Sequence, residues 1–206
     1  PAQITNCTIT NNSYTDLGSE GNAAGLMVES FAFASILNSI ITSEQSPAVT
    51  VGNHGTDGSA ELTIGYSLIS DGQDSIDVYE DGILIWGDGN IDVDPMFVDT
   101  ANSNYHLLAS SQCINGGHPD STDSDGSRAD IGGYPYLNSY SGPTWYITES
   151  GNDTTATGAS ADPFRSVQAG INFSSDTDSV TVSAGTYVEN INFRGRNIKV
   201  VGEDRE

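Results

Sequence analysis

The sequence predicts an all-β fold, and three observations carry this prediction. Short apolar runs with strand-like spacing recur along the chain, bounded by Gly, Asn, Asp and Ser, which favour turns. No helical period of useful length occurs before residue 160. The same kind of run returns every 28–32 residues, a spacing typical of a parallel solenoid in which each coil hydrogen-bonds to the next.

Three six-residue segments define the repeat: residues 4–9, 36–41 and 64–69. Each has an apolar residue at its first and sixth positions and a small Cys or Ser at its fourth. Stacked coils would bury like residues together, and each buried Ile or Leu contributes about 1.5–3 kcal/mol. Asn6 and Asn38 share one turn position, so we expect a short asparagine ladder there. An antiparallel sandwich with irregular turns is the alternative.

Further strands and one helix complete the expected elements. The additional strands cover residues 25–29, 48–51, 75–79, 83–86, 145–148, 179–191 and 198–203. A short amphipathic helix is expected near residues 162–173, because Asp162 suits an N-cap and Pro163 suits a first helical turn. Its apolar face carries Phe164, Val167 and Ile171.

Charge limits the classes of partner. The formal net charge is −22, of which residues 1–127 carry −18 because they contain no Lys or Arg. We expect no nucleic-acid partner and no docking on an anionic membrane, since both need clustered basic residues. No run of 18 apolar residues occurs, so no membrane insertion is expected. Cys7 and Cys113 fit no metal spacing and are expected to be small buried residues rather than a disulfide.

Four stretches resemble a known family. Residues 4–12 read Ile-Thr-Asn-Cys-Thr-Ile-Thr-Asn-Asn, and residues 89–98, 105–117 and 123–134 continue the pattern. Together they resemble right-handed parallel β-helix proteins of the pectate-lyase-like superfamily, which include large secreted bacterial proteins. The resemblance implies that residues 1–135 are C-terminal-type coils and the closing segment of a right-handed parallel β-helix.

The remainder resembles the opposite end of such a helix. A strand at 145–148, a loop from Gly151, the short helix and two further strands follow one another as in an N-terminal cap. The resemblance implies that residues 145–206 are a capping helix with the first coils, and that residues 136–144 are a linker. The chain would therefore carry the end of one β-helix before the start of another.

Both halves are expected to be incomplete, which would expose unpaired backbone groups and an apolar interior. Three explanations stay open: the halves stack within one chain, they stack head-to-tail between copies, or the chain is a fragment of a longer tandem protein. Stacking between copies is favoured, because residues 145–206 hold five of the six basic residues and would meet an acidic neighbour. The side chains expected at the junction are Tyr134, Tyr136, Tyr140, Trp145, Tyr146, Phe164, Val167 and Ile171.

The resemblance also implies what an enzyme of this fold would need. Lyases of the family use a Lys or Arg base, and hydrolases use paired aspartates beside a Gly-His-Gly element. Arg194 and Arg196 are the closest candidates for a base, but they are more typical of surface turns. His54 lies in Gly-Asn-His-Gly, which matches only superficially, and no adjacent Asp-Asp pair occurs. We therefore expect no enzymatic activity.

Calcium is the one cofactor that the sequence indicates. Four carboxylates surround a glycine turn at Asp120, Asp123, Asp125 and Asp130, and hard oxygen ligands at such spacing suit Ca²⁺. A weaker acidic cluster contains Asp88, Asn90, Asp92 and Asp94. Neither cluster has EF-hand spacing, and solvated acidic turns are the alternative for both.

The function expected from these features is structural or adhesive. The chain would be an extracellular or cell-surface β-helix protein, either a fibre subunit whose partners are copies of itself or a piece of a long surface stalk. The alternative is a carbohydrate-active or carbohydrate-binding β-helix with a polysaccharide partner. An excess of carboxylates suits saline surroundings, where salt screens the self-repulsion of the chain.

Overall fold

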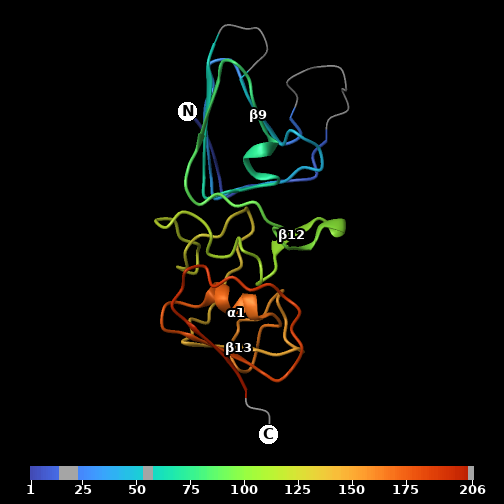
Figure 1. Ribbon diagram of the computed structural model, residues 1–206, viewed down its shortest axis with the longest axis vertical. Coiled ribbons are helices and arrows are strands. Elements are labelled where there is room, and N and C mark those ends of the chain that lie inside the picture. The colour runs from blue at the N-terminus through green and yellow to red at the C-terminus, as the bar shows by residue number, and fades with distance from the viewer. Residues whose placement is uncertain (14–22, 53–57, 204–206) are drawn as a thin grey trace. The chain divides into compact units, whose positions relative to one another are not determined.

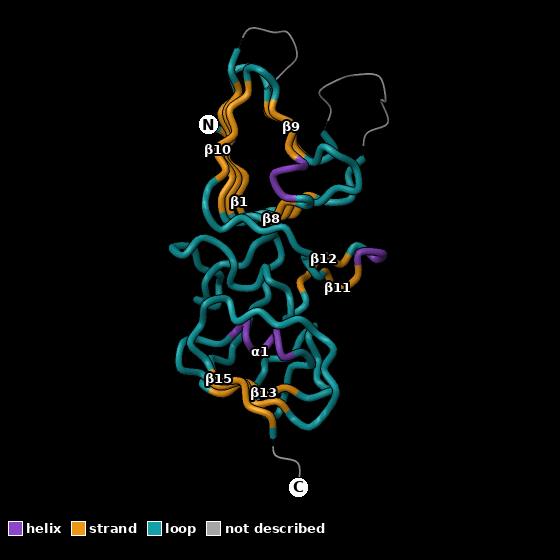
Figure 2. Tube along the Cα trace, viewed as in Figure 1, coloured by secondary structure: helices purple, strands orange, loops and turns teal. Residues whose placement is uncertain are grey.

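A computed structural model describes residues 1–13, 23–52 and 58–203. Within these residues the regular secondary structure is mostly short strands with one α-helix (Figures 1 and 2), so the all-β prediction is confirmed at that level. The chain forms two compact units. Unit 1 contains Pro1–Pro95, Gly116–Thr122 and Arg128–Tyr134. Unit 2 contains Met96–Asn115, Asp123–Ser127 and Pro135–Glu206, and so draws on residues from both sides of the segment 136–144.

Unit 1 is built on three parallel sheets. The first contains, in order, β1 (Ala2–Thr5), β4 (Phe33–Leu37), β7 (Ala60–Gly65) and β10 (Gly82–Trp86). The second contains β2 (Thr8–Ile9), β5 (Ile40–Ile41) and β8 (Leu68–Ile69). The third contains β3 (Leu26–Val28), β6 (Val49–Val51) and β9 (Ile76–Val78), with the 3₁₀ turn Gly72–Ser75 before β9. Each strand from β1 to β7 pairs with the strand three places further along the chain, as β1 does with β4. The chain therefore passes through all three sheets before it returns to the first (Figure 2), and we call one such passage a coil.

The register stacks like residues, as the repeat predicts. Ile4, Ile36 and Ile64 occupy one level of the first sheet, and Trp86 follows them at the same level. Ile36 and Ile64 are fully buried. The rest of the unit 1 core is also aliphatic, and its buried members are Val28, Ile41, Ala48, Val49, Val51, Ala60, Leu62, Ile69 and Ile76.

Hydrogen bonds through side chains join successive coils at the turn between the first two sheets. The Cys7 N–H donates to Ser39 Oγ at 3.1 Å, and the Ser39 N–H donates to Ser67 Oγ at 3.2 Å. The Ser67 N–H then donates to Asn90 Oδ1 at 3.1 Å. Each serine hydroxyl also donates to a carbonyl of its own coil. The small fourth position of the repeat is therefore a polar ladder, which we call the Ser–Asn ladder.

The expected asparagine ladder does not form at Asn38. In each coil, the residue that precedes the ladder residue has a left-handed backbone, with φ of 51° at Asn6, 50° at Asn38 and 48° at Tyr66. Asparagine tolerates this conformation better than most residues. Asn38 Oδ1 accepts the His118 N–H at 2.7 Å rather than a group of the neighbouring coil. The predicted turn is therefore correct, but the ladder is formed by the residue that follows Asn38, which is Ser39.

Residues 116–122 and 128–134 cover the outer face of the second sheet. The Gly132 N–H donates to the Asn38 carbonyl at 2.8 Å, and the Gly133 N–H donates to Thr8 Oγ1 at 2.9 Å. Gly132 has φ of 119°, and a Cβ there would come within 2.8 Å of the Ile40 side chain. This cover explains why Ile40 and Ile41 are both fully buried although neighbouring strand residues face opposite sides.

Unit 2 combines a parallel sheet, a hairpin and one helix. The sheet contains β13 (Thr144–Ile147), β14 (Ser179–Val182) and β15 (Lys199–Gly202). The antiparallel hairpin contains β11 (Phe97–Asp99) and β12 (Asn104–Leu107), joined by the 3₁₀ turn Thr100–Asn102. The helix α1 spans Val167–Phe173. In the part of the chain that the structure describes, no helix is long and apolar enough to cross a membrane.

The helix starts later than the predicted residue 162. Its N-cap is Ser166, whose side chain accepts a backbone N–H of the first turn. The Asp162 carboxylate instead accepts a backbone N–H within the preceding turn. Phe164 forms a parallel β-bridge with Ile147. It therefore lies before the helix, and of the three apolar residues predicted for the helix face only Val167 and Ile171 belong to α1.

Both ends of α1 are held by distant side chains. The Glu189 carboxylate accepts the N–H groups of Val167 and Gln168 at 2.8 and 2.9 Å, a favourable place for negative charge. The Gln168 side chain in turn bonds both backbone groups of Asn192. The strand predicted at residues 179–191 therefore ends at Val182. Glu189 and Asn192, further along the chain, contact the helix instead. At the other end, the Arg196 guanidinium donates to the carbonyls of Ile171, Asn172 and Ser174.

Asn172 links the helix to the segment that follows β12. It is fully buried, and its Nδ2 donates to the carbonyls of Ala109 and Ser111 at 3.0 and 2.8 Å. Its Oδ1 accepts from Gln168 Nε2 at 2.9 Å and from Arg194 Nη1 at 3.2 Å. Asn172 thus satisfies two buried carbonyls and two donors from one side chain.

Ser67→Ala is expected to lower the local stability of unit 1 by about 1–3 kcal/mol, because the buried Ser39 N–H loses its acceptor. Hydrogen exchange of the β4 and β7 amides in the full chain measures this change. The control is Ser59→Ala at an exposed serine of the same unit. Equal protection in the two variants would show that the ladder contributes nothing.

Asn172→Ala is expected to destabilise unit 2 by about 3 kcal/mol, because two buried carbonyls lose their donor and the Arg194 guanidinium loses an acceptor. Urea unfolding followed by the fluorescence of Trp145, with Trp86→Phe as the background, reports on this unit. Asn190→Ala, at an exposed asparagine of unit 2, should leave the midpoint unchanged. A similar shift in both variants would contradict a central role for Asn172.

Candidate functional site

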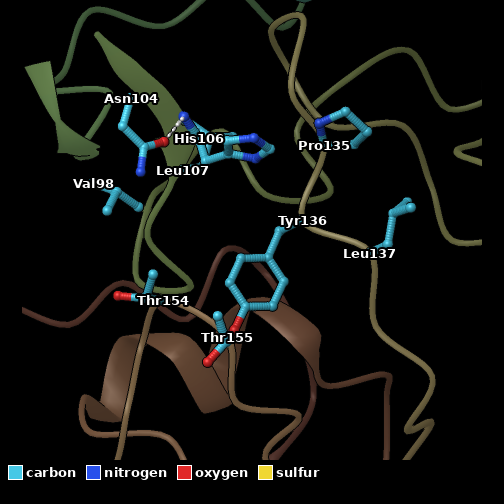
Figure 3. Close-up of a pocket in the computed structure, with 9 residues that line it drawn as sticks. All are labelled: Val98, Asn104, His106, Leu107, Pro135, Tyr136, Leu137, Thr154 and Thr155. Atoms are coloured by element: carbon cyan, nitrogen blue, oxygen red, sulfur yellow. Dashed lines mark hydrogen bonds between the residues drawn. The ribbon is translucent and has the colours of Figure 1, made fainter. Parts of the chain in front are cut away.

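A hollow of about 420 Å³ lies within unit 2 (Figure 3). It is bordered by the β11–β12 hairpin, by residues 135–137 and by a loop at residues 154–155. The residues that line it are Val98, Asn104, His106, Leu107, Pro135, Tyr136, Leu137, Thr154 and Thr155. Its volume is within the range of about 300–1,000 Å³ that is usual for small-molecule sites.

The hairpin gives the hollow one fixed wall. Its connecting turn is closed by Asp99, whose carboxylate accepts the N–H and the side-chain amide of Asn102 at 3.3 and 2.6 Å. These hydrogen bonds lower the pKa of the Asp99 carboxyl below its usual value. On β12, Asn104 Oδ1 accepts the His106 N–H at 3.3 Å (Figure 3). The alternation of β12 then places the side chains of Asn104 and His106 on the same side of the strand.

Tyr136 lines the hollow and lies near the middle of Figure 3, and neighbouring residues hold both its hydroxyl and its ring. Its hydroxyl donates to the Ala156 carbonyl at 2.6 Å. Its ring packs against Phe173 with a centroid distance of 5.3 Å and against Phe164 at 6.5 Å. Burial, followed by the charges of Asp153 and Asp162, raises the pKa of the Tyr136 hydroxyl far above its usual value. Tyr136 is therefore a neutral, fixed ring rather than a proton-transfer group.

A short turn presents the two threonines. Asn152 Oδ1 accepts the N–H groups of Thr154 and Thr155 at 2.6 and 3.3 Å, which is the pattern of an Asx turn. Both threonines are exposed, and Figure 3 shows Thr154 to the left of the Tyr136 ring and Thr155 beside its hydroxyl end. These two threonines were not predicted as site residues, although Asn152-Asp153-Thr154 is a recognisable turn signal.

The polar groups around the hollow are neutral amide and hydroxyl groups and one imidazole. Among the described residues that line it, none is Asp, Glu, Lys or Arg. The arrangement can therefore hold a ligand through hydrogen bonds and ring contact, but it presents no pair of carboxylates for acid–base chemistry.

In the first predicted Ca²⁺ site, Asp125 is bound by neighbouring residues of unit 2. Asp125 accepts the N–H and hydroxyl of Ser127 at 3.0 and 2.6 Å and the Asn138 N–H at 2.7 Å. Partial burial raises the pKa of the Asp125 carboxyl, but the hydrogen bonds outweigh this and leave the pKa below its usual value. Asp123 belongs with Asp125 to unit 2, whereas Asp120 and Asp130 belong to unit 1.

The second acidic cluster is partly structural. Asn90 forms the end of the Ser–Asn ladder, and its Nδ2 donates to the carbonyls of Ile64 and Gly87 at 3.0 and 3.1 Å. Asp92 accepts the Asp71 N–H at 3.0 Å. Asp88 and Asp94 are both exposed. Across the described residues, no group of three or more His, Cys, Asp or Glu side chains could hold a metal ion, and Ca²⁺ binding stays a prediction for both clusters.

The aromatic and aliphatic residues expected at a junction lie mostly in the core of unit 2. Its buried members are Trp145, Phe164, Val167 and Ile171, with Tyr136 and Tyr140 packed against them. Trp145 and Phe164 stack with centroids 6.2 Å apart, and Trp145 Nε1 donates to Asp178 at 3.0 Å. Tyr146 is half-buried on β13, whereas Tyr134 belongs to unit 1 and is 46% exposed.

The remaining candidates have structural surroundings. Arg194 donates to the carbonyls of Ile114 and Asn115, so Arg194 and Arg196 are both half-buried and bound to backbone rather than free on surface turns. His118 packs edge-on against Tyr66 at 4.8 Å. Neither Cys7, which is half-buried, nor Cys113, which is fully buried, forms a disulfide. His54 lies outside the described residues.

Comparison of this chain with protein-family models, with curated proteins and with solved structures found no match. The geometry of the chain itself therefore carries the functional argument.

Asn90→Asp distinguishes a structural role from a ligand role. A carboxylate cannot donate to Ile64 and Gly87, so we expect a loss of about 1–3 kcal/mol in the stability of unit 1 that Ca²⁺ does not restore. Urea unfolding with and without Ca²⁺ measures both effects. Asp88→Asn, at an exposed neighbour, is the control and should change stability little. Recovery of the Asn90→Asp variant by Ca²⁺ would instead favour a metal site.

Proposed function

We propose that this chain is a structural unit of the right-handed parallel β-helix type, which acts outside the cell in a fibre or a long surface stalk. The observation that carries the proposal is the regular return of the chain through three parallel sheets in unit 1. Such a solenoid is extended by adding coils, because each coil presents the same backbone edge to the next. An acidic surface that salt screens suits an extracellular or cell-surface location.

Two strand edges are the expected sites of extension. Among the described strands, β1 pairs only with β4, and β15 pairs only with β14. The Asn6 N–H donates to Leu37, so the alternation of a parallel ladder directs the N–H of Gln3 away from β4. In the same way, the Lys199 N–H donates to Asp178, which directs the N–H of Val200 away from β14.

The two edges are suited to one another. Each belongs to a four-residue parallel strand, and each has a half-buried aliphatic residue, Ile4 on β1 and Val200 on β15. β15 begins with Lys199, whereas the first 127 residues contain no Lys or Arg. We therefore propose that β15 of one copy pairs with β1 of another in a fibre. In a stalk, a further coil of a longer chain would occupy the same edge.

Gln3→Pro is expected to abolish assembly, because proline removes the outward N–H and cannot extend the ladder. Electron microscopy and light scattering of the 206-residue chain measure the effect. Gln3→Ala, which keeps the N–H, is the matched control and should assemble as the wild type does.

Two results would contradict assembly between copies. One is a wild-type chain that stays monomeric at high concentration, with fast hydrogen exchange at the outer amides of β1 and β15. The other is equal assembly by the Gln3→Pro and Gln3→Ala variants.

A further inference from the structure

Unit 1 has another strand edge, which the proposed pairing of β15 with β1 does not use. Among the described strands, β10 pairs only with β7, so its other edge is open. Proteins usually protect an edge strand with charged residues, proline or a bulge. β10 has none of these, because it reads Gly-Ile-Leu-Ile-Trp and pairs with β7 in a regular register. Its composition is that of a strand suited to pairing with a further chain.

The apolar interior of unit 1 is also partly open at this edge. Leu84 and Trp86 of β10 stack on Leu62 and Ile64 of β7. The two β7 residues are fully buried, whereas the two β10 residues are only half-buried. A further strand on the open edge would continue the stack and cover them.

The backbone of β10 presents hydrogen-bonding groups in the direction that a further strand needs. The Gly87 N–H donates to the Ile64 carbonyl at 2.8 Å, so the alternation of a parallel ladder directs the N–H of Leu84 away from β7. On the outer face of the strand, Ile83 and Ile85 are 48% and 44% exposed. The edge thus combines main-chain groups with alternating apolar side chains, which is what partners that bind by strand addition use.

Charge around the edge indicates the kind of partner. Exposed carboxylates flank β10 in the sequence, with Glu80 before it and Asp88 after it. Unit 1 contains a single Lys or Arg, which is Arg128. A segment flanked by lysine or arginine would therefore be attracted, and an acidic segment would be repelled. The β1 strand of a second copy fits less well, since residues 1–127 contain no Lys or Arg.

We propose that the open edge of β10 binds an extended segment of another protein, apolar in its middle and basic at its ends, which adds a fifth strand to the first sheet. The inner side chains of this segment would cover Leu84 and Trp86. Its Lys or Arg residues would lie near Glu80 and Asp88. The inference goes beyond the structural role proposed above, because it concerns a different strand edge and a partner of different chemistry.

The test uses the full chain with Gln3→Pro, so that assembly through β1 does not compete. The probe is the labelled synthetic peptide Lys-Lys-Val-Thr-Val-Thr-Val-Lys-Lys, and its binding is followed by fluorescence anisotropy. Saturable binding is expected, together with slower hydrogen exchange of the Leu84 and Trp86 amides. Exchange of the Val200 amide, at the β15 edge, should stay unchanged.

Two altered peptides separate strand pairing from general attraction. The peptide with glutamate in place of every lysine should not bind, because like charges repel. Replacing the central Thr-Val pair by Pro-Pro should also abolish binding, since it removes one N–H from each edge of the peptide. Replacing the same pair by Ala-Ala keeps both N–H groups and is the matched control, which should still bind.

On the protein side, the double variant Glu80→Gln, Asp88→Asn should weaken binding about fivefold and reduce its dependence on salt. The matched control is Glu44→Gln, Asp120→Asn, at two exposed acidic residues elsewhere in unit 1, which should bind as the Gln3→Pro parent does.

The proposal is overturned if the lysine peptide does not bind, if the glutamate or Pro-Pro peptide binds equally well, or if the two double variants bind alike. It is also overturned if the peptide protects Val200 rather than Leu84. Protection of Leu84 in the wild-type chain without peptide, lost in the Gln3→Pro chain, would show that a second copy occupies the edge instead. Because peptide binding is measured in the Gln3→Pro chain, its outcome is separate from that of the assembly experiment.

Discussion

In unit 1, the first strand of each repeat ends at a turn where a backbone N–H needs an acceptor, and the next coil supplies it. The acceptor is Ser39 for the first coil, Ser67 for the second and Asn90 for the third. Because the bond reaches into the following coil, it sets the register between coils. That register then stacks Ile36 on Ile64 in the core, so polar satisfaction and apolar packing depend on one another.

Unit 2 solves the same problem with longer side chains. The carbonyls at the end of a seven-residue helix cannot be satisfied within so short a segment. Arg196 reaches them from beyond the helix, and Asn172 connects the helix to the segment after β12. These polar contacts hold the helix against the aromatic cluster around Trp145 and Phe164. The same cluster supports the ring of Tyr136 and thereby one wall of the hollow.

The sequence allowed most strands to be predicted, since apolar spacing and turn residues are local signals. The start of α1 could not be predicted, because the bridge from Phe164 to Ile147 is a long-range contact. Asn90 occupies the position of Ser67 in the next coil, since Ile91 pairs with Leu68. The sequence did not reveal this equivalence because the turn before Asn90 is one residue longer, so Asn90 was assigned to an acidic cluster instead. The hollow was missed because its walls come from three separate segments.

The chemistry of the Ser–Asn ladder bears on where such a chain could work. Its members are hydroxyl, amide and backbone groups, none of which titrates near neutral pH. The contacts that hold the coils in register should therefore respond little to pH or salt. Salt should act mainly on the repulsion among the acidic residues, which it weakens. Because the contacts between coils are neutral and the carboxylates repel one another, the fold should become more stable as ionic strength rises. This dependence suits the proposed extracellular role.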